Sequence, residues 1–239
     1  MHIFIWITRL RMGCGCMSRI IKPGPLHIQA YNIMKKQFLE GQYEPGERII
    51  ELQFAEKLGI SRGPLREAIR MLMHDGLLIQ DDRSVHLFKP TLEDIIEVFQ
   101  CREYLELLAV RLASKNMTGT LQQKLSLNIQ NLREAVEKNS KKDISAYDQE
   151  FHDLIIYASK NKQLIELMTK IQIKITYMRN NIFRNYHTRL DFTDEHKSIF
   201  QALVDNDIAK AEEEMRNHIE SNLNFIIQAN NNDNSYRKK

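Results

Sequence analysis

The chain has 239 residues, more than a single domain usually contains, and this length predicts two domains of about 70 and 140 residues. Apolar residues make up 43% of the chain but never form an uninterrupted run near the roughly 20 residues that span a bilayer, which excludes an integral membrane protein. Basic residues outnumber acidic ones by 13 to 9 up to Lys89 and are outnumbered 21 to 22 beyond it, so a phosphate-binding surface is expected in the N-terminal third. The three cysteines, Cys14, Cys16 and Cys101, suit neither a disulfide framework nor a four-thiolate zinc site and favour a reducing cytoplasm.

The first folded domain is expected over residues 17–90, with residues 1–16 interpreted as disordered or as sequence upstream of a true start at Met17. Apolar residues recur with helical spacing from Leu26 to Phe38, a short helical segment covers 51–58, and Ser61 is predicted to cap a helix that ends near His74. Two β-capable runs, 77–79 and 85–88, flank a polar turn and predict a hairpin. Together these elements indicate a winged helix-turn-helix.

The second domain is expected to be an all-helical bundle over residues 91–230, followed by a polar tail at 231–239. Thr91 and Asp94 form a capping-box pattern that opens a helix to about Ser114, and no strand pattern recurs after it. Further helices are predicted at 118–138, 141–160, 162–186, 192–205 and 207–230. The fold class is therefore mainly α: an N-terminal winged helix-turn-helix and a C-terminal all-α bundle.

The helix that follows Ser61 has two distinct faces. One is apolar and is expected to pack, and the adjacent face carries Arg62, Gly63, Arg66 and Arg70. An arginine can donate two hydrogen bonds to a guanine in the major groove, and the Ser61 hydroxyl can reach a phosphate. Spacing alone leaves open the alternative that these arginines form a solvated helix face.

A resemblance to a known family bears on that choice. The stretch ISRGPLREAIRML at residues 60–72, followed by DGL at 75–77, resembles the recognition-helix signature of the GntR family of transcription regulators, and the match covers about residues 25–90. The resemblance implies that Ser61, Arg62, Gly63, Arg66 and Arg70 contact DNA. The sequence departs from the family pattern at the wing tip, 82–84, and at 52–53.

In the second half, four polar residues lie on or beside apolar helix faces. Asp148 and His152 are spaced by four residues on one face of a helix, and His196 and His218 each lie within the apolar face of another helix. Buried polar groups need partners, and one divalent ion bound by three imidazoles and a carboxylate would satisfy all four. Taken singly, each histidine is also consistent with an ordinary hydrogen-bonded core residue.

The region from about 92 to 230 resembles the FCD ligand-binding domain of the FadR subfamily of GntR regulators, in whose metal-binding members these four positions are the ligands. The resemblance implies a divalent ion, with zinc favoured over nickel or manganese. Arg102 shares the inward face of its helix, where it either forms a structural ion pair with Glu106 or binds an effector carboxylate. Tyr177, Arg179 and His187 are weaker candidates for the cavity wall.

These observations predict a cytoplasmic transcription regulator, not an enzyme. It is expected to act as a repressor, to bind a pseudo-palindromic operator as a homodimer, and to respond to a small organic or sugar acid bound at the metal. Two alternatives remain open at this point: a metal-dependent hydrolase, and a metal-free regulator whose histidines hydrogen-bond among themselves.

Overall fold

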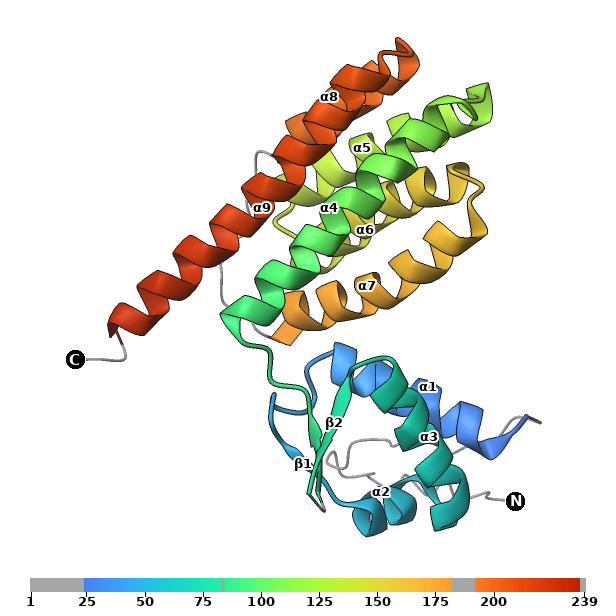
Figure 1. Cartoon of the computed structure of the whole chain (residues 1–239), viewed down its shortest axis with the longest axis vertical. Helices are drawn as coiled ribbons and strands as arrows, with labels where there is room; N and C mark the ends of the chain where they lie inside the picture. Colours follow the sequence, from blue (N-terminus) through green and yellow to red (C-terminus); the bar gives the residue numbers. More distant parts are fainter. Residues whose placement is uncertain (1–23, 83, 182–191, 237–239) are drawn as a thin grey trace, which may run out of the picture.

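The computed structural model describes residues 24–82, 84–181 and 192–236, which form two units joined by the segment between β3 and α4 (Figure 1). The N-terminal unit contains α1 (Leu26–Leu39), β1 (Arg48–Ile49), α2 (Glu51–Leu58), α3 (Arg62–His74), β2 (Leu78–Asp81) and β3 (Ser84–Leu87). The C-terminal unit contains α4 (Leu92–Ser114), α5 (Gly119–Glu137), α6 (Lys141–Ala158), α7 (Lys162–Asn181), α8 (Phe192–Val204) and α9 (Ile208–Tyr236). The predicted fold class is confirmed.

The N-terminal unit is built around the apolar face of α3. Its members Leu65, Ala68, Ile69 and Leu72 are buried as the periodicity predicts, and they pack against the buried face of α1. The helix does begin after Ser61, but the predicted capping hydrogen bond from the Ser61 side chain is absent. The predicted start of the helix is therefore correct, but the hydrogen bond that was expected to stabilise this start is not formed.

The wing is a three-stranded antiparallel sheet in the order β1-β3-β2. The β2–β3 hairpin corresponds to the two predicted runs. The third strand, in which Arg48 pairs with His86 and Ile49 with Val85, was not predicted, because two residues are too few to display an alternating pattern.

The C-terminal unit is a bundle in which α4 packs against α6, α7 and α9. The predicted capping box is formed: the Thr91 side chain accepts from the Asp94 backbone, and the Asp94 carboxylate accepts from the Thr91 backbone. α9 continues to Tyr236, past the predicted helix end at 230 and into the predicted polar tail. Residues 1–16, and residues 182–186 of the helix predicted at 162–186, lie outside the described residues. None of the helices described here is long and apolar enough to cross a membrane.

The end of α7 ties the two units together. Tyr177 is fully buried in the core of the N-terminal unit, and its hydroxyl donates a 2.5 Å hydrogen bond to the carbonyl of Phe88. The side-chain amides of Asn180 and Asn181 donate to the carbonyls of Leu39 and Phe38, at 2.9 and 3.1 Å. Because these donors satisfy the carbonyls at the C-terminal end of α1, the contact is specific. Tyr177, a weak candidate for the ligand cavity, has this different role.

Candidate metal centre and DNA-binding surface

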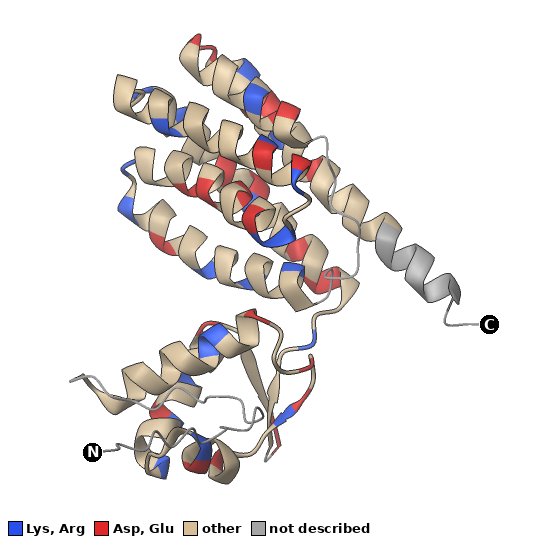
Figure 2. Cartoon of the chain, turned by 180° about the vertical axis from the view of Figure 1, so that it is seen from behind, with Lys and Arg blue, Asp and Glu red and all other residues tan. Residues whose placement is uncertain are grey.

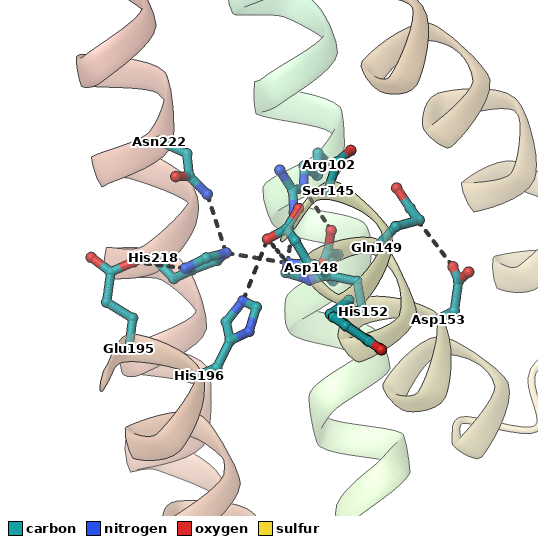
Figure 3. Close-up of polar contacts among 12 residues, drawn as sticks. Arg102, Ser145, Asp148, Gln149, His152, Asp153, Glu195, His196, His218 and Asn222 are labelled. Carbon is teal, nitrogen blue, oxygen red and sulfur yellow. Dashed lines mark hydrogen bonds and ion pairs between the residues drawn. The ribbon is translucent and has the colours of Figure 1, made fainter. Parts of the chain in front are cut away.

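Four predicted ligand residues converge inside the helical bundle (Figure 3). Asp148 and His152 come from α6, His196 from α8 and His218 from α9, and one potential ligand atom from each lies within 4.8 Å of all the others. The three histidines are buried and Asp148 is partly buried. Residues up to 70 positions apart in the chain are thus brought to one point by three helices.

Two of the imidazole rings are fixed by carboxylates on their outer side. His152 Nδ1 faces a carboxylate oxygen of Glu106, and His218 Nδ1 lies 2.8 Å from Glu195 Oε2. A carboxylate accepts, so each Nδ1 carries the proton and each Nε2 is left with a lone pair. Those two Nε2 atoms face each other at 3.2 Å. Two lone pairs at this distance repel unless a cation lies between them or each receives a donor.

The third ring, His196, lacks the usual partners of a buried imidazole. It is completely buried and stacks on Phe151 with ring centroids 3.9 Å apart, yet neither ring nitrogen makes a hydrogen bond. Burial lowers the pKa of His196 well below its ordinary value, and the neighbouring His218 lowers it further, so the ring is neutral. An unsatisfied buried polar group costs about 1–3 kcal/mol, which needs a compensating partner. His196 Nε2 points at Asp148 Oδ1, 3.6 Å away.

The carboxylates around the cluster are held in the charged form. Burial raises the pKa of Asp148, but the Arg179 guanidinium and the three neighbouring histidines together lower it below its usual value. Arg179 Nη1 also donates a 2.9 Å hydrogen bond to Asp148 Oδ2. Burial likewise raises the pKa of Glu106, and Arg102 and His152 together lower it to about 2. Asp148 therefore presents an ionised Oδ1 to the three rings.

Arg102 forms the predicted ion pair with Glu106, with Nε donating to Oε1 at 2.6 Å. Its Nη2 reaches further and lies 2.9 Å from His152 Nε2, and the Asn222 amide nitrogen lies 3.1 Å from His218 Nε2. Arg102 thus satisfies the structural prediction and also points into the cluster, which is the geometry that contact with an effector would require.

The chemistry of the donor set fits a divalent cation. Zinc–nitrogen bonds of about 2.1 Å place neighbouring ligand atoms about 3.0–3.4 Å apart, close to the 3.2 Å between the two Nε2 atoms. Metal-binding histidines commonly donate their second ring nitrogen to a carboxylate, as His152 and His218 do here. Asp148, His152, His196 and His218 could hold the ion.

The predicted DNA-binding residues form an exposed surface at the start of α3. Ser61, Arg62, Gly63, Arg66 and Arg70 are all exposed. Arg66 Nε donates to Glu51 Oε2 of α2 at 2.9 Å, and Arg70 is paired with Glu67 on its own helix. Figure 2 shows basic and acidic residues side by side on the helices farthest from the bundle. Arg66 and Arg70 would therefore have to leave a carboxylate in order to contact DNA.

Comparison with known proteins decides the family. A family model described as "Bacterial regulatory proteins, gntR family" matches residues 26–85, and one described as "FCD domain" matches residues 97–221. The chain is 31% identical over 208 residues to the HTH-type transcriptional regulator YdhC of Bacillus subtilis, which covers 86% of this chain and 91% of that protein. The chain belongs to the gntR family of bacterial regulatory proteins.

Other similarities agree with this assignment. The HTH-type transcriptional repressor RspR of Escherichia coli is 23% identical over 197 residues, covering 82% of this chain and 86% of that protein. The structure of McbR from E. coli superimposes with a TM-score of 0.73 at 23% identity, over 85% of this chain and 98% of the other. This gntR-family protein is thus a DNA-binding transcription regulator with a C-terminal FCD domain. Because its relatives and its fold are those of regulators, the hydrolase alternative is not supported.

Three charged residues of this regulator's FCD domain contribute to the centre in ways that periodicity does not reveal. Glu106 was predicted only as a partner of Arg102, Arg179 only as a weak candidate for the wall, and no role was predicted for Glu195. Each contacts a ligand residue across a helix–helix interface. Such contacts depend on which helices are neighbours, information that the spacing within one helix does not contain. His187 lies outside the described residues.

Proposed function

We propose that this gntR-family regulator is a repressor whose operator affinity is controlled by a small organic or sugar acid bound at a metal centre in the FCD domain. The ion is held by Asp148, His152, His196 and His218, and zinc is favoured over nickel or manganese. The protein acts as a homodimer on a pseudo-palindromic operator, since one helix-turn-helix reads too few base pairs for useful specificity. We also propose that the protein belongs to the FadR subfamily and acts in the cytoplasm.

One observation carries the metal proposal. The Nε2 atoms of His152 and His218 lie 3.2 Å apart, and each ring has its Nδ1 proton engaged by a carboxylate, so two lone pairs converge beside an ionised Asp148. Arg102 Nη2 and the Asn222 amide nitrogen lie within hydrogen-bond distance of these two Nε2 atoms. The ring nitrogens of His196 have no such donor among the described residues, and an ion at the cluster is a partner that would satisfy all three rings.

A divalent ion with three imidazoles and one carboxylate keeps coordination positions that a carboxylate of the effector can occupy. Arg102 then supplies the second contact, because its Nη2 is directed at the cluster while its Nε remains held by Glu106. A guanidinium fixed in this way donates to a carboxylate without losing further side-chain freedom. These contacts favour a small, charged, oxygen-rich molecule over an apolar one.

At the other end of the molecule, the exposed start of α3 is the proposed DNA-reading surface. Arg62 and Arg66 are assigned to base edges in the major groove, and Ser61, Gly63 and Arg70 to the backbone. The Ser61 hydroxyl makes no capping hydrogen bond, which leaves it available to a phosphate. Gly63 has open space around its Cα, which allows close approach of the DNA backbone.

Helix α7 offers a route between the two sites. Arg179 donates to the proposed ligand Asp148, while Tyr177, Asn180 and Asn181 on the same helical turn donate to the N-terminal unit. A change in the position of Asp148 on effector binding would therefore act on the segment that holds α1. Because coupling between sites is reciprocal, operator DNA should change effector affinity by the same factor.

The proposal is tested by measuring operator affinity with metal-loaded and chelator-treated full-length protein, using a duplex selected from a random pool and citrate as a probe acid. We expect two chains per duplex, and a severalfold change in affinity on adding citrate to the metal-loaded protein only. One chain per duplex would contradict the dimer. An equal effect of citrate on both preparations would support the metal-free alternative instead.

A further inference from the structure

A groove separate from the metal centre lies where the N-terminal unit meets the bundle. Its volume is about 670 Å³. One wall is the end of α3 and the turn after it, at 74–76, and the others are α4, at 100–105, and α7, at 167–174. Ligand sites of about 300–1,000 Å³ commonly occur at such junctions between domains.

The wall of the groove is largely apolar and partly open to solvent. Tyr104 and Leu105 of α4 face Leu167 and Ile171 of α7 across it. Tyr104 is 72% exposed and Leu167 is 52% exposed, although both are large and apolar in character. A contiguous group of exposed apolar side chains is typical of a binding surface, whereas apolar side chains that are exposed singly need no such explanation.

The charge on the wall is positive and is not neutralised by described residues. Lys170 and the half-buried Lys174 make no ion pair or hydrogen bond within the described chain, whereas the acid on the wall, Asp75, already accepts from Tyr31 and Lys35 at 2.5 and 3.0 Å. The Lys174 side chain lies against Gly76, and its Cε would be 3.0 Å from a Cβ added at that position. Gly76 has a φ of +74°, which independently favours glycine.

We propose that this groove binds a small apolar anion, with an aromatic or aliphatic body between α4 and α7 and an acidic group on Lys170 and Lys174. The chemistry follows from the wall: apolar side chains favour burial of an apolar body, and two ammonium groups that no described residue neutralises favour an anion. The site is distinct from the metal centre, because none of the four proposed ligands lines it. Its occupant bridges the end of the recognition helix and the effector domain.

The exposed thiol of Cys101 lines the groove and serves as a local reporter. In full-length protein with Cys14→Ser and Cys16→Ser, we would measure the rate at which iodoacetamide alkylates Cys101, with 8-anilino-1-naphthalenesulfonate as the probe anion. We expect the saturating probe to slow alkylation at least fivefold. N-phenyl-1-naphthylamine, which has the same apolar body without the sulfonate, should protect about tenfold less effectively.

Substitution of the two lysines separates the contribution of charge to probe binding from the contribution of the apolar wall. The double variant Lys170→Gln, Lys174→Gln should weaken protection by the sulfonate about tenfold and leave that by the neutral probe unchanged, whereas Lys162→Gln, elsewhere on α7, should alter neither. Equal protection by both probes, or no protection, would overturn the proposal. Protection that grows with protein concentration in the absence of probe would also overturn it, by showing that a second copy covers the groove. Chelator should not change the result, so failure here leaves the proposed metal centre untouched.

Discussion

Arg66 offers a way to separate DNA reading from folding. Its ion pair with Glu51 joins side chains that are 56% and 34% exposed, and a pair this accessible to water stabilises the fold by only about 0–1 kcal/mol. A bidentate contact with a base contributes about 1–3 kcal/mol of discrimination. The substitution Arg66→Ala should therefore weaken operator binding by about 5- to 150-fold while leaving the melting temperature almost unchanged.

The assay is fluorescence anisotropy with a selected operator duplex and a scrambled duplex, at one fixed salt concentration. Arg133→Ala, an exposed arginine on α5, is the matched control, and it should bind both duplexes like the wild type. Glu51→Gln should tighten binding to both duplexes a few-fold, because it frees Arg66 and removes a negative charge facing the phosphates. Wild-type operator affinity in Arg66→Ala would refute the reasoning, and equal losses on both duplexes would assign Arg66 to the DNA backbone.

Three further predictions concern the fold and the centre. Tyr177→Phe removes the donor to the Phe88 carbonyl and should lower the free energy of unfolding, measured by urea denaturation, by about 1–3 kcal/mol. The control Tyr157→Phe, at an exposed tyrosine, should leave the free energy of unfolding unchanged. Equal free energies of unfolding for Tyr177→Phe and the wild type would contradict the role of Tyr177. Glu106→Gln should lower metal affinity about 10- to 100-fold in competition with a chelating dye, since it alters the group that orients His152; unchanged affinity would exclude that role. Thr91→Ala removes the capping box and should lower the free energy of unfolding by about 1 kcal/mol in the same denaturation assay. A change in the free energy of unfolding no larger than the experimental error would contradict this prediction.

Periodicity within single helices accounted for much of the fold. It identified the buried face of α3 and the shared face of Asp148 and His152, and it identified His196 and His218 as inward-facing. These predictions succeed because burial within one helix depends on side chains three and four positions apart, which the sequence displays directly.

Contacts between distant helices were not accessible in this way. Glu106 is 46 positions from His152, and Tyr177 is 89 positions from Phe88. Nothing in the local pattern around Tyr177 distinguishes a side chain that enters the core of the other unit from one that lines a cavity. The short strand β1 also escaped prediction, because its pairing with β3, rather than its own two residues, defines it.

The central claim is that the four converging residues hold a metal ion, and metal content measures this directly. Inductively coupled plasma mass spectrometry of protein purified without chelator should give about one divalent ion per chain in the wild type and in His74→Ala, an exposed histidine elsewhere. His196→Ala, His218→Ala and the milder Asp148→Asn should lose the ion, and added zinc should raise the melting temperature of the wild type but not of these variants. A wild-type content well below one ion per chain, unchanged after adding zinc, nickel or manganese, would contradict the account and leave the four residues as an ordinary polar core.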